Sequence, residues 1–366
     1  GQQDSRTVHR TVHTAVLMSV IGGILVALLG QLAAGPLLGA LNVPEDVLPF
    51  ALRYLRIYLL GMPAILLYNF EAAIFRSVGD TKVPLQALVV SGILNVLMNL
   101  FFVAVLHMTV EGVATATVLA NVFSAIILLR RLMISPLDIR VEPKALRIHA
   151  DCMGRILRIG LPAGIQSAVF SVSNIVIQAG INSLGTVVMA ASSAALNLEL
   201  MAYFVLNSFS QACTTFVGQN YGAWKLDRCK KTLALSLLED AIATAAVIAL
   251  VLGAGKPVLA IFNNDPQVIS LGYTRLVLVF SAYMFSMMYE VMSGYLRGFG
   301  ISLTPAALTT LGVCGIRIFW IAVVFPRNPT FRTIMYVYPI SLSTTALLIF
   351  LALLWFRPAK RAAERE

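Results

Sequence analysis

Long apolar stretches alternate with short polar breaks along the whole chain. A helix needs about 20 mostly apolar residues to cross a bilayer, and each of these stretches is of about that length or longer. Membrane-spanning strands would instead alternate polar and apolar side chains over about ten residues, a pattern that the stretches lack. The hydropathy pattern therefore predicts an all-α, polytopic helical membrane protein with ten helices, at about residues 11–41, 47–75, 83–107, 111–132, 157–183, 186–217, 231–254, 267–296, 303–325 and 331–356.

The composition and the distribution of charge agree with this assignment. Hydrophobic residues make up 58% of the chain and charged residues only 12%, whereas soluble domains are about half apolar and about a quarter charged. The net charge of +10 would also suit a nucleic-acid-binding protein. The basic residues, however, gather in alternate breaks, and the opposite breaks carry only Lys256, Arg327 and Arg332. This positive-inside pattern predicts a multi-pass protein of the inner (plasma) membrane, with both ends of this chain in the cytoplasm and no nucleic-acid partner.

A short motif occurs twice, in two polar breaks that lie 221 positions apart. The sequence IFRSVGDTKVPL (74–85) returns as YLRGFGISLTPA (295–306), so that Gly79 corresponds to Gly300. An even number of predicted helices separates equivalent points, so both copies are expected to have the same orientation in the membrane. Parallel repeats of this kind hold the substrate path between the two halves.

The repeat divides the chain into two predicted lobes. We expect an N-terminal lobe at 1–132, a cytoplasmic linker at 133–156, a C-terminal lobe at 157–356 and a basic cytoplasmic tail at 357–366. The C-terminal lobe holds six predicted helices and the N-terminal lobe holds four, and the chain opens with glycine rather than methionine. We therefore expect ten helices of a twelve-helix protein, with the first two helices preceding this sequence. The alternative is a protein that naturally has ten helices.

Cysteine and histidine residues give no sign of a metal or redox centre. The four cysteines and four histidines are scattered, without the paired spacing of a disulfide framework or a metal cluster. An intramembrane enzyme would need a nucleophile with a base, or a metal constellation, and neither H-E-x-x-H nor G-x-S-x-G occurs. We therefore predict a protein that is not an enzyme and has no cofactor or bound metal. A channel is another alternative, but two lobes in tandem suit alternating access better.

Four motifs together resemble those of the multidrug and toxic compound extrusion (MATE) family of transporters. They are RSVGDTKVP (76–84), FVGQNYGA (216–223), YLRGFGISLTP (295–305) and RIFWIAVVFP (317–326). The resemblance implies two six-helix lobes and a monomeric antiporter that exports drug-like small molecules, amphipathic and often cationic, in exchange for sodium ions or protons. The alternative within the superfamily is a flippase for lipid-linked oligosaccharides, which usually has more basic charge in its cavity than this sequence offers.

Ionisable residues inside the predicted helices are candidates for ion coupling, because a charge in hydrocarbon costs several kcal/mol. Glu199, Asp240 and Glu290 all lie within predicted helices. A carboxylate at depth can hold a proton and later exchange it for a cation or a drug ammonium group. The structural alternative is an internal hydrogen bond or a charge pair, for instance with Arg317, which is itself deep and can either neutralise a carboxylate or be released during transport.

Two asparagines stand one helical turn apart in the predicted helix at 83–107. Asn95 and Asn99 therefore lie on one face of that helix. The resemblance implies a cation site here, because the family often has an asparagine followed four residues later by an aspartate. Asn99 takes the place of that aspartate, so it can coordinate an ion or a drug but cannot titrate. Gln166 offers a further polar group, in a helix where one sodium-coupled branch of the family has a glutamate.

Two polar residues lie near the end of the predicted helix at 47–75, and only the second is a site candidate. Glu71 lies five residues before Arg76, and we interpret it mainly as an interfacial partner of that arginine. Asn69 aligns with Glu290 in the repeat, and this polar pair is expected to flank the path between the lobes.

Overall fold

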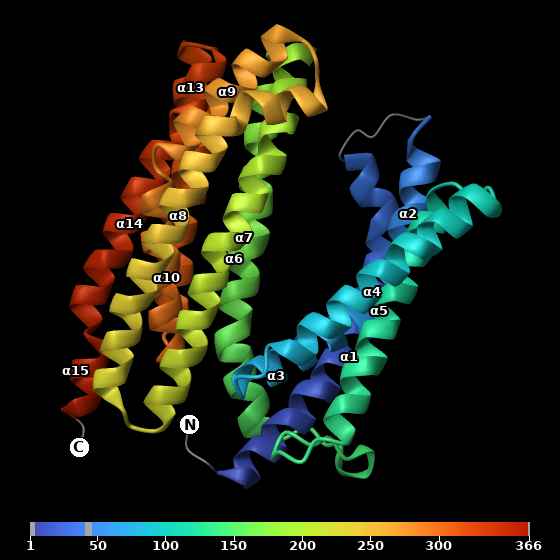
Figure 1. Ribbon diagram of the computed structural model, residues 1–366, viewed down its shortest axis with the longest axis vertical. Coiled ribbons are helices and arrows are strands. Elements are labelled where there is room, and N and C mark those ends of the chain that lie inside the picture. Colours follow the sequence, from blue (N-terminus) through green and yellow to red (C-terminus); the bar gives the residue numbers. More distant parts are fainter. Residues whose placement is uncertain (1–3, 41–45, 365–366) are drawn as a thin grey trace. The chain divides into compact units, whose positions relative to one another are not determined.

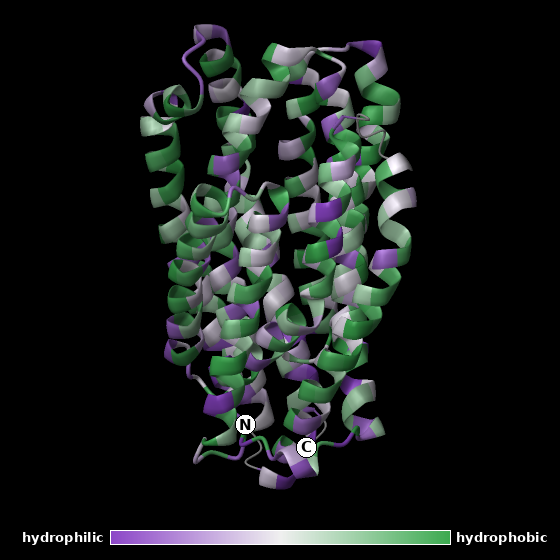
Figure 2. Cartoon of the chain, turned by 90° about the vertical axis from the view of Figure 1, so that its right-hand side faces the viewer, coloured by the Kyte–Doolittle hydropathy of each residue, from purple (hydrophilic) through white to green (hydrophobic). Residues whose placement is uncertain are grey.

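The computed structural model describes residues 4–40 and 46–364, and these residues are almost entirely helical (Figure 1). By their internal contacts the described residues divide into two compact units, here called the N-terminal unit (up to residue 156) and the C-terminal unit (from residue 157). Hydrophobic positions run along the long helices, while hydrophilic positions concentrate toward their ends (Figure 2). The expectation of an all-α, polytopic fold is confirmed.

The N-terminal unit is built around α3, which packs against α1 and α5. Val16, Phe75 and Leu128 contribute to its buried core. A π-helical turn (Phe101–Val105) extends α4, and a polar loop with a short 3₁₀ turn (Pro143–Ala145) follows α5. The helices are α1 (Ser5–Ala40), α2 (Leu48–Leu60), α3 (Met62–Ser77), α4 (Lys82–Leu100) and α5 (Val110–Met133).

The C-terminal unit is centred on α7 and α10, which pack against each other and share α8 as a neighbour. Helix α6 begins at Ala150, within the N-terminal unit, and continues into the C-terminal unit, so the end of the predicted linker is helical. Two π-helical turns flank α12. The helices are α6 (Ala150–Asn182), α7 (Thr186–Gly222), α8 (Leu226–Phe262), α9 (Pro266–Phe280), α10 (Tyr283–Gly298), α11 (Leu303–Thr309), α12 (Ile316–Phe319), α13 (Phe331–Met335), α14 (Val337–Phe356) and α15 (Pro358–Ala363).

Two of the predicted helices are bent pairs. Within the described residues, 8 helices are long and apolar enough to cross a membrane, or up to 10 if each bent pair counts as one span. The helix predicted at 47–75 is α2 followed by α3, bent by 49°, and the one predicted at 267–296 is α9 followed by α10, bent by 46°. The first bend is explained by Pro63, because proline has no N–H with which to continue the hydrogen bonds of α2 across Gly61.

The repeated glycine ends α3 and α10 in the same way. Gly79 and Gly300 have φ of +88° and +80°, in the left-handed region that glycine adopts without a Cβ penalty. The N–H of each glycine donates to the carbonyl three residues earlier. The next N–H donates to the carbonyl five residues earlier, and this second bond is 3.0 Å long in both copies. These bonds form a Schellman cap, and this shared cap explains why the glycine occurs at both positions.

Replacing Gly300 by alanine is expected to lower the thermal unfolding temperature of the purified protein. Nothing lies within 4 Å of a Cβ built at this position, so the cost is backbone strain of about 1 to 2 kcal/mol. Gly300→Asn is expected to lose less, because asparagine tolerates the left-handed conformation. An equal loss in both variants would show that backbone strain is not the cause.

Candidate functional site

A buried ion pair joins α7 and α9 in the C-terminal unit. The Nε of Arg275 donates to Oε1 of Glu199 at 2.5 Å, and its Nη2 donates to Oε2 at 2.8 Å. Glu199 is 7% exposed and Arg275 only 2%. A guanidinium that meets a carboxylate through two parallel hydrogen bonds is among the strongest polar contacts in proteins. Both charges are therefore compensated inside the unit.

Three neighbouring side chains hold this pair in place. Arg275 also donates to the hydroxyls of Ser192 and, at 3.5 Å, Tyr338, and Tyr283 donates to the backbone carbonyl of Glu199 at 3.0 Å. The partner of Glu199 is thus Arg275 and not Arg317, the example considered from the sequence. Arg275 lies within the apolar helix predicted at 267–296. Its position in the sequence therefore already indicated a second arginine deep in the membrane.

Two further carboxylates of the C-terminal unit are paired less completely. Glu290 of α10, 9% exposed, accepts a hydrogen bond from the Tyr203 hydroxyl at 3.4 Å, and its other oxygen lies 3.8 Å from Nη2 of Arg297. Asp240 of α8 is fully buried and accepts from the Thr244 hydroxyl at 3.1 Å. Its Oδ2 has no hydrogen-bond partner among the described residues. Asp240 therefore carries a buried carboxyl oxygen that is free to bind a proton or a cation.

Arg317 of α12 is buried, at 7% exposure, without an acidic partner in the described part of the chain. Its guanidinium carbon lies 4.6 Å from the ring centre of Tyr338, and its Nη1 lies 3.4 Å from the side-chain oxygen of Asn174. Its Nε has no hydrogen-bond partner there. The interaction with the Tyr338 ring offsets part of the cost of burial, and the guanidinium keeps a free donor for an anionic group.

The N-terminal unit contains one carboxylate whose role the sequence analysis misjudged. Glu71 of α3 is fully buried, and neither of its oxygens has a hydrogen-bond partner within the described residues. The interpretation of Glu71 as a partner of Arg76 is wrong, because no ion pair joins them. Residues five apart on a helix lie roughly 140° apart around its axis, so this spacing turns the two side chains away from each other.

A polar cluster joins α4 and α5 of the same unit. The amide of Asn99 donates to the side-chain oxygen of Asn95 at 3.0 Å, which shows that the two residues share a face, and the amide of Asn95 donates to the Thr117 hydroxyl of α5 at 3.4 Å. The Oδ1 of Asn99 has no partner in the described part of the chain. The cluster thus offers neutral oxygen ligands, which suit a hard cation such as sodium.

The two other polar candidates lie apart from these groups. Asn69 is exposed on α3 and donates to the carbonyl of Ile65 in its own helix at 2.7 Å. Gln166 is half-buried on α6. Among the described residues, no hydrogen bond or ion pair links either side chain to the carboxylates, arginines or asparagines described above.

Comparison with known proteins identifies the family. The MatE family model matches residues 1–101 and 162–323. The probable multidrug resistance protein YoeA of Bacillus subtilis is 23% identical over 327 residues, which cover 87% of this chain and 70% of YoeA. An FAD transporter of Shewanella oneidensis is 24% identical over 267 residues, covering 70% of this chain and 58% of that protein.

Comparison with a solved structure supports the same family fold. The crystal structure of a MATE protein in complex with MaL6 matches with a TM-score of 0.90 at 18% identity, covering 99% of this chain and 82% of that one. The chain spans 58% to 70% of the length of the two curated relatives. Since the family model matches well over half of the chain, the chain belongs to the MatE family.

Proposed function

We propose that this chain acts in a secondary-active multidrug efflux antiporter that exports amphipathic or cationic compounds in exchange for sodium ions or protons. The observation that carries the proposal is that each unit has a buried carboxylate with no ion-pair partner among the described residues, Glu71 in one and Asp240 in the other. An unpaired charge at such a site costs several kcal/mol. Each carboxyl group is therefore expected to hold a proton or to meet a cation that arrives from outside.

The two groups would serve exchange in the following way. In the resting state the buried carboxyl carries a proton, which removes its charge. Loss of that proton creates a site for a sodium ion or for the ammonium group of a drug, and return of the proton releases the cargo. In the N-terminal unit, the cluster of Asn95, Asn99 and Thr117 would offer a second set of oxygen ligands for the cation, without charge of their own.

The family relationship supports this proposal. YoeA is named as a probable multidrug resistance protein, and the chain is a multi-pass membrane protein with the MATE fold. We further propose that it works as a monomer in the inner membrane with both ends of this chain in the cytoplasm.

The proposal is tested by ethidium efflux from cells that express the protein in its full-length form. Efflux is expected to stop when ionophores collapse the sodium and proton gradients, and cells with an empty vector serve as the control. Efflux that continues after both gradients are collapsed, and that stops only when ATP is depleted, would contradict secondary-active transport.

One observation favours a second candidate, a flippase or exporter of anionic cargo such as a lipid-linked oligosaccharide. Arg317 is buried without an acidic partner among the described residues and keeps a free Nε donor. Guanidinium groups of this kind bind carboxylates and phosphates. One relative is named as a transporter of FAD, a compound that carries phosphate groups.

Arg317→Gln separates these two candidates. If the cargo is anionic, the variant is expected to lose about 10- to 100-fold in transport of a phosphate-bearing compound such as FAD, while ethidium efflux stays near the level of the unchanged protein. Radiolabelled uptake into inverted membrane vesicles measures both. Equal effects on the two compounds would assign Arg317 a structural role and count against anionic cargo.

A further inference from the structure

His13 of α1 is fully buried and holds the loop that joins α5 to α6. Its Nε2 accepts a hydrogen bond from the backbone N–H of Glu142 in that loop at 3.0 Å, and its Nδ1 lies 2.8 Å from the backbone carbonyl oxygen of His9, one turn earlier in α1. The ring therefore joins the start of α1 to a segment that lies 129 positions later in the chain.

These two partners fix the protonation state of the ring. A carbonyl oxygen can only accept a hydrogen bond, and a backbone N–H can only donate one. Nδ1 of His13 must therefore carry a hydrogen and Nε2 must keep its lone pair, which defines one neutral tautomer. A proton on Nε2 would face the N–H of Glu142, and both donors would then lack an acceptor. The charged form of His13 is incompatible with the loop in this position.

The bond to Glu142 lies where the loop enters the core of the N-terminal unit. Ile139 and Val141 are only 1% and 2% exposed and belong to that core. The N–H of Val141 also donates to the carbonyl of Leu132, near the end of α5, at 3.2 Å. Glu142 follows Val141 directly, so a shift of Glu142 away from His13 also pulls Val141 out of its packing.

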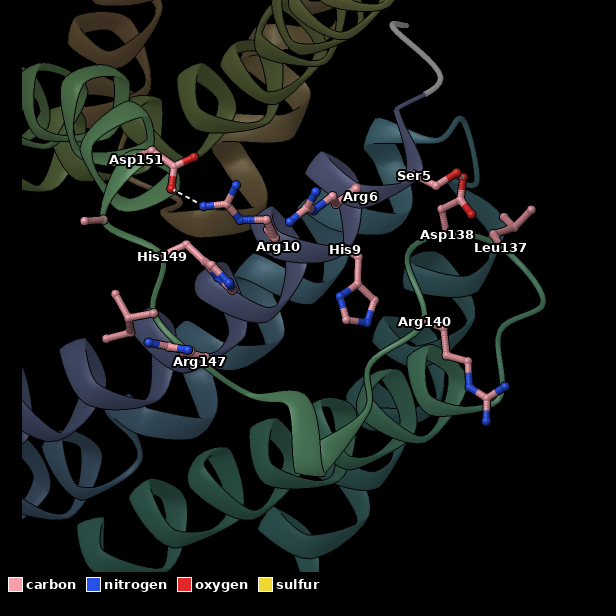
Figure 3. Close-up of a pocket in the computed structure, with 12 residues that line it drawn as sticks. Ser5, Arg6, His9, Arg10, Leu137, Asp138, Arg140, Arg147, His149 and Asp151 are labelled. Carbon is pink, nitrogen blue, oxygen red and sulfur yellow. Dashed lines mark hydrogen bonds and ion pairs between the residues drawn. The ribbon is translucent and has the colours of Figure 1, made fainter.

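The contacts at the two ends of the loop are more exposed. Figure 3 shows Ser5 beside Asp138 at one end and Arg10 joined to Asp151 at the other, and both contacts are 2.7 Å long. Exposed ion pairs contribute little to stability. The middle of the loop therefore depends mainly on His13 and on the packing of its apolar side chains.

Two other histidines lie nearby, and neither is constrained in this way. The ring of His9 stacks on His13 with the ring centres 3.9 Å apart, and it has no hydrogen bond among the described residues. Nδ1 of His149 lies 3.3 Å from the Thr14 hydroxyl, which itself donates to the carbonyl of Arg10. A charged His149 can keep this contact as the donor. Of these three histidines, only His13 must be neutral for the loop to stay bound.

No carboxylate bonds to the His13 ring within the described residues. On α1, Arg10 is already in an ion pair. On α3, which packs against α1, Glu71 and Arg76 form no hydrogen bond or ion pair with the ring, and α2 packs against the other half of α1. The charged side chains of α5 and of the loop that lie closest in sequence to this contact are exposed, namely Arg130, Arg131 and Glu142. Protonation therefore places an uncompensated charge in a buried position, which costs free energy unless the ring reaches water.

We propose that His13 is a pH-sensitive latch for the loop at 134–149. While the ring is neutral it holds the loop against α1, and when it takes up a proton the loop is released and the charged ring reaches water. Histidine suits this role because it ordinarily changes charge between about pH 5 and 8. The loop leads into α6, which continues into the C-terminal unit, so its release frees part of the connection between the two units. The latch stands whatever the cargo of the transporter is.

The test measures hydrogen exchange of the loop amides in the purified full-length protein, expressed as protection factors so that the intrinsic pH dependence of exchange cancels. Opening that takes up one proton is expected to lower the protection of Val141 and Glu142 about tenfold between about pH 7.5 and about pH 5.5, because a solvated histidine changes charge near about pH 6.5. Lys225, whose N–H bonds within the turn between α7 and α8 at 2.8 Å, is expected to keep its protection. Loop protection that stays constant over this range would overturn the proposal.

Matched variants identify the titrating group. His13→Gln offers an oxygen acceptor to the N–H of Glu142 without a titrating ring, so the tenfold change is expected to disappear. His9→Gln and His149→Gln remove the two neighbouring histidines and are expected to keep it. A pH-dependent change that survives in His13→Gln, or that is lost only in one of the two controls, would assign the switch to another group and overturn the latch.

A second measurement leaves His13 unchanged. In the triple variant His9→Gln, His107→Gln and His149→Gln, His13 is the last of the four histidines of this chain, so the nitrogen NMR signals of its ring can be assigned. The neutral Nδ1–H tautomer is expected at about pH 7.5, and the imidazolium should appear in step with the loss of loop protection. A ring that is already charged at the higher pH, or that stays neutral while the loop opens, would contradict the latch.

Discussion

Replacement of Glu199 by glutamine is expected to destabilise the protein by about 3 to 5 kcal/mol, because it leaves the Arg275 guanidinium buried without a counter-charge. Arg275 is only 2% exposed, so water cannot take over the role of the carboxylate. The melting temperature of the purified protein is expected to fall by several degrees, and the amount of folded protein in the membrane should fall with it.

A double variant distinguishes a broken ion pair from a general loss of packing. Glu199→Gln combined with Arg275→Met removes the orphaned charge, so it should recover most of the lost stability. Asp227→Asn is the matched control, because Asp227 pairs with Lys230 on an exposed surface at 3.3 Å, and exposed pairs contribute little. If the double variant were less stable than Glu199→Gln alone, the structural account of this pair would be wrong.

Replacement of Glu71 by leucine is expected to have opposite effects on stability and on transport. Leucine removes two buried oxygens that have no hydrogen-bond partner among the described residues, and an unsatisfied buried polar group costs about 1 to 3 kcal/mol. The melting temperature should therefore rise. Because the exchangeable proton is lost, gradient-driven ethidium efflux should fall about 10- to 100-fold. A loss of this size corresponds to a typical coupling free energy between two sites, about 1 to 3 kcal/mol.

Two further variants separate the loss of the Glu71 proton from the loss of a carboxylate in general. Glu71→Gln keeps the shape of the side chain without its proton chemistry and is also expected to lose coupled efflux. Glu111→Gln removes a carboxylate that lies in the first turn of α5 and pairs with Arg53 at 2.8 Å, and it should leave efflux nearly unchanged. A less stable Glu71→Leu variant with normal efflux would show that Glu71 is a packing residue and not a coupling group.

The sequence predicted the membrane spans well because they are recorded in a local pattern. Apolar length predicts a spanning helix, and the glycine at the left-handed cap of α3 returns at the equivalent end of α10. The bends within the two predicted helices were missed, since the chain stays apolar through each bend and hydropathy carries no information on helix direction. The proline at position 63 was the local signal for the first of them.

The candidate site was predicted only in part, because partners depend on tertiary packing. Glu290 and Arg297 lie seven residues apart, two helical turns, and the structure brings them to 3.8 Å. Glu71 and Arg76 lie five apart, a spacing that separates them around the helix. Glu199 pairs with Arg275, which lies 76 positions away. No local pattern in the sequence shows that its partner is Arg275 and not Arg317.

The central claim, ion-coupled antiport, is tested most directly in proteoliposomes that contain the purified full-length protein and no other pump. Sodium or proton gradients of either direction are imposed, and the movement of ethidium is followed by fluorescence. An ion-coupled antiporter is expected to let one of these ion gradients drive ethidium against its own concentration gradient, and reversing that ion gradient should reverse the ethidium flux. Ethidium that moves only down its own gradient, at a rate independent of both ions, would contradict it.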